Sequence, residues 1–310
     1  MIKPARLKIG DTIGILSPAS PVNSRKLNRG ILKLKKLGYK VILDKNVLAK
    51  RGFLAGSDKI RANALNRMFG NSKINVILCA RGGYGTLKLL DLLDYKTVKK
   101  NPKILVGFSD ITALHLAIHK KCNLVAFHGP MVASDFSRLS EYNKTYFLKA
   151  ASQTEPIGKI QNSKRIGNWK VIASGKASGK ILGGNLSLIC RLMGTDYQPD
   201  FKDKILFLED INSKPYQIDS LLAQLQLAGV LDRVKGVIIG EFFNFGPRKK
   251  DSYGSSLRQV FEDYFKNSPY PVIYPVSCGH GKDKITIPLG VKVTIDTYKK
   301  IFSIDEAGVK

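Results

Sequence analysis

The chain has 310 residues, of which 44% are hydrophobic, and it carries a formal net charge of +27 at pH 7. This length favours two domains, the apolar fraction is ample for packed cores, and no apolar run is long enough to cross a membrane. The charge is compatible with a non-catalytic basic protein that binds nucleic acid or an acidic polymer, but dispersed basic pairs and triplets, such as Arg248-Lys249-Lys250, are more typical of solvated lysine-rich faces.

The first half of the chain alternates predicted strands with predicted helices. Apolar residues in 13–16 predict a first strand, and the spacing of apolar residues in 27–37 predicts a helix. The alternation continues with strand 39–43, helix 57–69, strand 74–80 and helix 87–93. This order is typical of a parallel sheet with helices packed on its faces, so we predict the α/β class.

A glycine-rich segment, residues 81–85, directly follows the strand predicted at 74–80. Glycines at such a point let the backbone approach a ligand and expose amide donors, although a plain tight turn would look the same. The segment has neither the spacing of a dinucleotide fingerprint nor the lysine-serine pair of a P-loop. Because the carboxyl ends of parallel strands line one crevice, we expect this loop to lie near the turn that follows the next strand.

That next strand and its helix occupy residues 103–119 and are separated only by Gly107-Phe108-Ser109-Asp110. A serine on a tight strand-to-helix turn is typical of a nucleophile elbow, in which the hydroxyl stands clear of the sheet. The usual motif has a glycine two residues after the serine, where this chain has Ile111. Helix capping by serine or aspartate is the alternative interpretation.

The composition changes after residue 137, where a polar helical segment leads to a stretch rich in Gly, Ser, Lys and Asn. We predict an N-terminal domain at 1–155, a linker at 156–178 and a C-terminal domain at 179–310. The elements predicted beyond the linker are a helix within 180–193, strand 204–211, helix 218–228, strand 234–243, helix 256–265, and strands 286–295 and 300–304.

A serine nucleophile needs a base and a carboxylate that orients the base. His115 and His119 lie one helical turn apart and could bind a metal, but no acidic cluster accompanies them, which favours packed or surface histidines. His128 follows a predicted strand, and His280 is flanked by glycines that would let it reach across a cleft. Both histidines remain candidates for the base.

Glu209 and Asp210 end a strand whose interior is wholly apolar. Burying a carboxylate there without a partner would cost several kcal/mol, so either acid is a helix cap or a site residue. The residues by themselves leave both acids and both candidate histidines open as partners of Ser109.

The four cysteines, Cys79, Cys122, Cys190 and Cys278, have no paired spacing and predict reduced, mostly buried thiols in a cytoplasmic protein. A nucleophile pair of Cys278 with His280 is a weaker rival, because the two are too close along the chain to be arranged freely. The basic start of the chain is followed by an apolar segment too short for a signal-peptide core.

Six short segments occur in one order over nearly the whole chain: residues 10–20, 81–85, 107–110, 183–186, 207–210 and 279–280. Together they resemble the LD-carboxypeptidase family of serine peptidases, which includes muramoyl-tetrapeptide carboxypeptidases and the microcin C self-immunity peptidase. The resemblance implies a flavodoxin-like parallel-sheet N-terminal domain and a smaller α/β C-terminal domain that meet over a cleft. It also implies a homodimer, with no metal or organic cofactor.

By this resemblance Ser109 is the nucleophile, His280 the general base and Glu209 its orienting acid. The implied oxyanion donors are the backbone amides of Asp110 and Gly83.

The implied activity releases terminal D-alanine from muropeptide tetrapeptides during peptidoglycan recycling, by cleavage of an L,D peptide bond through an acyl-enzyme. Arg81 is predicted to anchor a substrate carboxylate, with Tyr84 also contacting substrate, although Arg81 could instead hold the glycine loop. One alternative is a microcin C-type immunity peptidase that acts on peptidyl or acyl-sulfamoyl adenylates.

Overall fold

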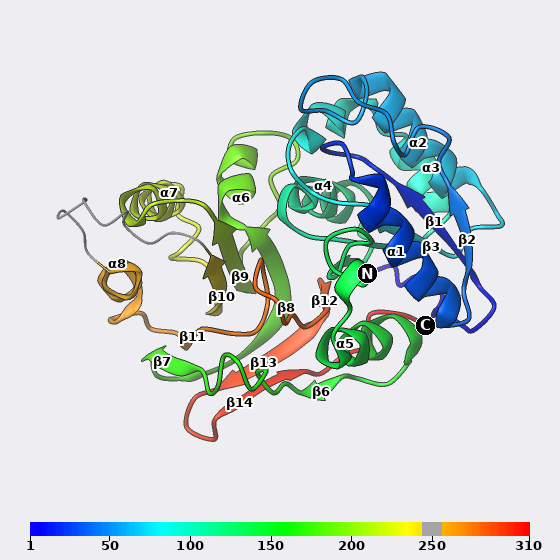
Figure 1. Cartoon of the computed structure of the whole chain (residues 1–310). Coiled ribbons are helices and arrows are strands. Elements are labelled where there is room, and N and C mark those ends of the chain that lie inside the picture. The colour runs from blue at the N-terminus through cyan, green and yellow to red at the C-terminus, as the bar shows by residue number, and fades with distance from the viewer. Residues whose placement is uncertain (244–255) are drawn as a thin grey trace.

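The computed structural model describes residues 1–243 and 256–310, so the basic triplet Arg248-Lys249-Lys250 lies outside the described residues. The chain builds two sheets with helices around them, and the two termini lie near each other (Figure 1). Backbone hydrogen bonds between Arg6 and Lys310 and between Lys310 and Pro4 join the two ends.

The first sheet has six strands, in the spatial order β12 (Ile287–Leu289), β5 (Ala126–His128), β4 (Ile104–Gly107), β3 (Val76–Cys79), β1 (Thr12–Leu16) and β2 (Lys40–Leu43). Strands β1 to β5 are parallel to one another, and β12 is antiparallel to β5. The central strands β3 and β4 are buried at every residue, which is why their sequences are continuous apolar runs. This sheet confirms the predicted α/β class.

The helices of this half are α1 (Ser24–Lys36), α2 (Asp58–Gly70), α3 (Tyr95–Lys100), α4 (Thr112–Cys122) and α5 (Glu141–Ser152). Most begin with a side-chain cap: Asn23, Ser57, Asp94 and Ser140 each accept a hydrogen bond from a first-turn amide. The helix predicted at 87–93 is a 3₁₀-helix, Thr86–Leu92, and the sequence pattern did not indicate α3.

The second sheet has eight strands, in the spatial order β6 (Gly158–Lys159), β14 (Ile301–Ile304), β13 (Lys292–Asp296), β8 (Lys176–Asn185), β9 (Lys204–Ile211), β10 (Gly236–Phe243), β11 (Val272–Tyr274) and β7 (Lys170–Ala173). Strands β8 to β11 are parallel, and the outer strands pair antiparallel. The helices of this half are α6 (Leu186–Leu192), α7 (Pro215–Leu227) and α8 (Leu257–Phe265).

Two segments differ from the elements expected. The stretch predicted as linker contains β6 and β7 and the first residues of β8, all paired within the second sheet. The single strand expected at 286–295 is two strands, because the left-handed Gly290 lies between them, directly after β12. As a result β12 joins the first sheet and β13 the second, so the chain returns to the first half at β12 and then re-enters the second half (Figure 1). The domain boundaries at 155 and 178 stay a prediction.

The two halves meet where α4 approaches the end of β8. The hydroxyl of Thr112, the first residue of α4, accepts a hydrogen bond from the amide of Asn185 at 3.0 Å. Gly184 has a φ of +141°, and a Cβ there would lie 2.7 Å from the Thr112 hydroxyl. The glycine therefore makes this close approach possible. Among the described residues, no helix has both the length and the apolar character needed to span a bilayer.

Candidate active site

Ser109 lies on the turn between β4 and α4 with a φ of +65°, a left-handed conformation that is strained for a residue with a Cβ. Gly107 must be small, because a Cβ there would lie 2.9 Å from the Ile111 side chain. No side-chain hydrogen bond caps the short 3₁₀-turn at Ser109–Ile111 or the helix that follows. The turn therefore has the geometry of a nucleophile elbow rather than that of a capped helix start.

The glycine loop packs directly against this elbow. A Cβ on Gly82 would lie 3.1 Å from the Cβ of Ser109. Beyond the loop, the amide of Thr86 donates to the Asp110 carboxylate at 2.9 Å, and the Thr86 hydroxyl donates to the Asp110 carbonyl. Burial raises the pKa of Asp110 against these hydrogen bonds. The expected meeting of the glycine loop with Ser109 is thus observed.

Gly83 has a φ of +120°, and a Cβ there would overlap the hydroxyl of Ser20. The same hydroxyl accepts a hydrogen bond from the Tyr84 amide at 3.1 Å, and the Ser20 amide donates to the Gly82 carbonyl. Ser20, in the segment after β1, therefore fixes the conformation of the glycine loop at residues 82–84.

The buried Arg61 of α2 completes this part of the site, and sequence reasoning missed it. Its Nη1 donates to the carbonyls of Pro18 and Gly85 at 2.7 and 2.9 Å, and its Nη2 pairs with Asp58. The side chain has no exposed surface. An arginine on the apolar face of a predicted helix was the available signal, because a buried guanidinium needs several acceptors.

Glu209 and His280 form a direct hydrogen bond, with 2.6 Å between Nδ1 and Oε2. Burial alone would raise the pKa of Glu209, but the imidazoles of His280 and His128 outweigh it and lower the pKa to about 2. Burial likewise disfavours the imidazolium of His280, but the Glu209 carboxylate outweighs burial and raises the pKa of His280. The pair is thus an ionised acid holding a basic imidazole.

Asp210, the other acid left open, points away from this pair. It accepts hydrogen bonds from the amide of Ser187 at 2.9 Å, from the Ser187 hydroxyl at 2.7 Å and from the side chain of Asn185 at 3.2 Å. Successive side chains of a strand face opposite sides of the sheet, so only one of the two acids can face His280. Asp210 fastens the start of α6.

His280 lies beside the elbow, because its ring packs edge-on against Phe108 with 5.0 Å between the ring centroids. Phe108 immediately precedes Ser109, so the His280–Glu209 pair lies close to the elbow turn. His128 also lies there, with its Nε2 3.8 Å from Oε1 of Glu209.

The other candidates lie elsewhere or make structural contacts. Burial lowers the pKa of His115 to about 3 and that of His119 to about 4, and the described residues contain no cluster suited to a metal. Arg81 donates from Nη1 to the Pro21 carbonyl at 3.2 Å. Tyr84 is about half exposed and packs edge-on against the exposed ring of Phe53. All four cysteines are unpaired and buried, as expected.

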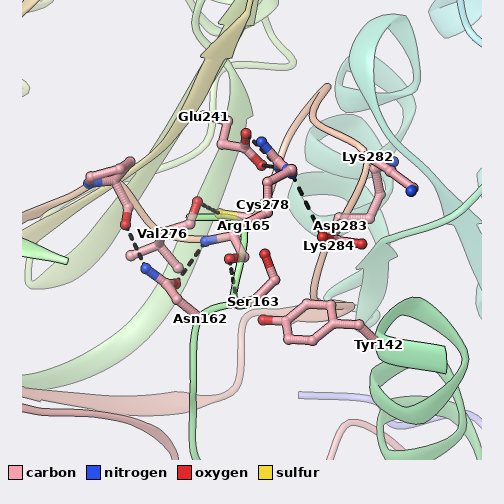
Figure 2. Close-up of polar contacts among 12 residues, drawn as sticks. Tyr142, Asn162, Ser163, Arg165, Glu241, Val276, Cys278, Lys282, Asp283 and Lys284 are labelled. Atoms are coloured by element: carbon pink, nitrogen blue, oxygen red, sulfur yellow. Dashed lines mark hydrogen bonds and ion pairs between the residues drawn. The ribbon is translucent and has the colours of Figure 1, made fainter. Parts of the chain in front are cut away.

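The loop that carries His280 is held from the second sheet by a buried acid, Glu241 of β10 (Figure 2). Arg165 binds both oxygens of Glu241 at 2.6 and 2.7 Å and lies 3.6 Å from Asp283. The Glu241 amide donates to the Cys278 carbonyl at 2.7 Å, and a Cβ on Gly281 would overlap the Glu241 carboxylate. Arg165 comes from the predicted linker, which therefore contributes to the site's support.

The same loop is also attached to the first half of the chain, through contacts that Lys284 of the loop makes with Asp135 and Asn143. Its buried ammonium pairs with Asp135, and its amide donates to the side chain of Asn143 at 2.9 Å. The side chain of Asn143 in turn donates to the Lys282 carbonyl at 3.1 Å. The Lys284 ammonium also lies 4.9 Å from the centre of the Phe108 ring. Contacts on both sides therefore fix the position of His280 relative to the elbow.

A serine on an elbow, a glycine loop beside it and an imidazole oriented by a buried carboxylate are the parts of a serine hydrolase. Residues 13–129 match the LD-carboxypeptidase N-terminal domain, and residues 178–295 match the LD-carboxypeptidase C-terminal domain. The chain belongs to the LD-carboxypeptidase family, as the sequence segments predicted.

Individual relatives cover nearly the whole chain. The Bacillus subtilis protein named "Probable murein peptide carboxypeptidase" is 38% identical over 309 residues, which are 99% of this chain and 95% of the relative. The microcin C7 self-immunity protein MccF of Escherichia coli is 31% identical over 332 residues, covering 97% of this chain and 95% of the relative.

Solved structures agree with this. MccF in complex with glutamyl sulfamoyl guanosine superposes with a TM-score of 0.91 at 27% identity, covering 100% of both chains. The muramoyltetrapeptide carboxypeptidase from Oxalobacter formigenes gives a TM-score of 0.82 at 29% identity, covering 96% of this chain and 98% of that one. The predicted two-domain α/β fold is confirmed.

Proposed function

We propose that this protein is a serine LD-carboxypeptidase that releases terminal D-alanine from muropeptide tetrapeptides and so serves peptidoglycan recycling. The observation that carries the proposal is the 2.6 Å hydrogen bond between His280 and the buried Glu209, with the His280 ring packed beside the elbow of Ser109. The murein peptide and muramoyltetrapeptide carboxypeptidases among the relatives support the choice of substrate.

In the first step the Ser109 hydroxyl attacks the carbonyl carbon of the L,D peptide bond. Nδ1–H of His280 donates to Glu209, so Nε2 carries the lone pair that accepts the serine proton. The carboxylate stabilises the imidazolium that forms. The amides of Gly83 and Asp110 are the proposed donors to the oxyanion, each typically contributing about 10²–10³ in rate.

In the second step the imidazolium of His280 gives its proton to the amine of the departing D-alanine, and an ester to Ser109 remains. Water, deprotonated by the same imidazole, attacks this ester; the bond to the Ser109 oxygen breaks, the imidazolium returns the proton to that oxygen, and the shortened peptide leaves. His280 therefore serves as the base in both halves of the reaction, and the buried Glu209 keeps the imidazole of His280 in the same tautomer throughout.

Arg81 and Tyr84 are the proposed substrate-binding residues at the rim of this site. Arg81 uses one nitrogen on the Pro21 carbonyl and is exposed, so its remaining donors can take a substrate carboxylate. In the Arg81→Ala variant we expect a higher KM for tetrapeptide with little change in kcat, and an unchanged KM would remove Arg81 from substrate binding.

We further propose that the enzyme works in the cytoplasm as a homodimer on a small peptide, with no specific nucleic-acid partner. Four unpaired, buried cysteines support a reducing compartment. Light scattering of the purified protein tests the dimer, and the salt dependence of any DNA binding tests whether the +27 charge has a sequence-specific partner.

A second candidate function, hydrolysis of acyl-sulfamoyl nucleosides, is favoured by the close superposition on MccF bound to glutamyl sulfamoyl guanosine. The two functions are separated by offering tetrapeptide and a glutamyl sulfamoyl nucleoside side by side and measuring the products by mass spectrometry. D-alanine release that is lost in Ser109→Ala supports the first function. Turnover of the sulfamoyl compound alone supports the second, and no Ser109-dependent turnover of either would refute both.

A further inference from the structure

Glu209 lies between two imidazoles, one facing each of its carboxylate oxygens. His280 Nδ1 is 2.6 Å from Oε2, and His128 Nε2 is 3.8 Å from Oε1. The mechanism above uses only the first of these histidines. The side chains of Glu209 and His128 both have no exposed surface, so no part of either is in contact with bulk solvent.

The polar atoms on the His128 side of the acid have no other partner. Among the described residues, Oε1 of Glu209 and both ring nitrogens of His128 are buried without a hydrogen bond. A buried carboxylate oxygen without a donor is costly, and Nε2–H of His128 is the donor that faces it. The 3.8 Å separation is longer than a hydrogen bond, but catalytic hydrogen bonds of free enzymes are often long and tighten when substrate binds.

The sheet holds His128 in this place. It is the last residue of β5, paired with Gly107 at the end of the elbow strand β4 and with Ile287 of β12. The position that presents its ring to Glu209 is therefore set by the strand that carries the nucleophile turn. A surface histidine would not be restrained in this way.

The other neighbours of His128 keep its surroundings apolar and add no opposite charge. The rings of Phe207 and Phe108 lie 4.9 and 5.7 Å from it, centroid to centroid. The other titratable group in the same pocket is His115, whose pKa is lowered to about 3 by burial and which is therefore neutral. Glu209 is thus the only charged group facing His128 that the described contacts provide.

We propose that His128 is a positioning residue of the peptidase, neutral and protonated on Nε2, which donates to Oε1 of Glu209 and keeps that carboxylate ionised and directed at His280. His128 touches neither substrate nor the reacting atoms, and its proton stays on Nε2 throughout. This inference rests on the proposed function, because its kinetic consequence is read through the Ser109 reaction.

Three substitutions of His128 distinguish the effect of its Nε2–H donor from the effect of the size of its ring. The side-chain amide of glutamine in His128→Gln can reach the place of Nε2, whereas the shorter amide in His128→Asn reaches only the place of Nδ1, and His128→Leu has no donor. We expect kcat to fall about tenfold to a hundredfold in the Asn and Leu variants with KM unchanged, and to stay within about threefold of wild type in the Gln variant.

His115→Gln, which replaces a second fully buried imidazole, is the matched control and is expected to keep wild-type kcat. Equal kcat values in the Gln and Asn variants, or wild-type kcat in the Leu variant, would overturn the proposal. Thermal unfolding of each variant shows whether a lost rate reflects a lost fold.

A second measurement needs neither variants nor turnover. With ¹⁵N-labelled histidine in the wild-type protein, nitrogen chemical shifts report the tautomer of each of the four histidines. We expect His128 to be the Nε2–H tautomer at neutral pH. An Nδ1–H tautomer, or an imidazolium at neutral pH, would overturn the proposal even if the enzyme were active. Absence of muropeptide turnover by wild type would instead refute the proposed function.

Discussion

Replacing Glu209 by glutamine tests the assignment of the acid most directly. The substitution keeps the shape of the side chain and an oxygen that can accept from His280, but it removes the negative charge. Because the acid is fully buried and bonded to Nδ1 at 2.6 Å, its charge acts on the imidazolium over a short distance. At a separation of about 4 Å and an effective dielectric constant near 20, the interaction is about 4 kcal/mol.

A loss of about 4 kcal/mol from the transition state corresponds to roughly a 10³-fold fall in kcat. Glu209 does not reach solvent, so KM for tetrapeptide should change little. The measurement is the initial rate of D-alanine release as a function of tetrapeptide concentration.

The pH dependence of kcat/KM tests the role of the Glu209 charge independently of the size of the rate loss. His280 must be neutral to act as a base, and its pKa is raised, so activity of the wild type is lost as pH falls through a value above the ordinary 6.5 or so. In Glu209→Gln the support of the carboxylate is gone while burial remains. The acid limb of kcat/KM should therefore move to lower pH.

Asp210→Asn is the matched control, one residue further along the same strand. Its carboxylate holds Ser187 and Asn185, so we expect wild-type kcat with a loss of about 1–2 kcal/mol in the free energy of unfolding. The assignment of Glu209 would be refuted if its Gln variant kept kcat within tenfold of wild type, or if Asp210→Asn lost as much.

Three further substitutions test the elbow, the glycine loop and the support of His280. Both Ser109→Ala and Ser109→Gly should abolish D-alanine release. The glycine variant should be about 1 kcal/mol more stable to denaturant than the alanine variant, because the φ of +65° strains a residue with a Cβ. Equal stabilities of the two variants would contradict the strained elbow. Gly83→Ala should lower kcat about a hundredfold, since its Cβ would overlap Ser20 and displace a proposed oxyanion donor, whereas Gly70→Ala, with only an ordinary contact at 3.7 Å, should leave steady-state kinetics unchanged. Arg165→Met leaves the buried Glu241 without its ion-pair partner, so we expect the free energy of unfolding to fall by about 1–2 kcal/mol and kcat to fall about tenfold. Adding Glu241→Gln should restore both values, as measured by chemical unfolding and steady-state kinetics of the double variant. Failure of the double variant to recover would argue against the ion pair as the support of the His280 loop.

Local pattern was sufficient for much of this protein. The apolar runs of the central strands and the helical spacing between them predicted a parallel sheet, because those patterns reflect burial within one element. The tight Gly107-to-Asp110 turn predicted an elbow for the same reason, since strand and helix leave no room for a longer loop. The order of the short family segments then predicted Ser109, Glu209 and His280 together.

The tertiary structure decided what local pattern leaves open. Period-two alternation predicts that Glu209 and Asp210 face opposite sides of β9, but only the contacts with His280 and Ser187 show which of the two acids meets the histidine. The split of residues 286–295 between the two sheets likewise depends on distant partners rather than on the strand's own residues.

The sequence by itself therefore determined most of the elements of the first sheet and the tight turn at Ser109, because each depends on neighbours a few residues away. The tertiary structure determined the clamp of Arg165 on Glu241, the buried Arg61 and the second imidazole beside Glu209. Each of these joins residues that are distant along the chain, and the free energy of such a contact depends on which groups the folded chain buries together.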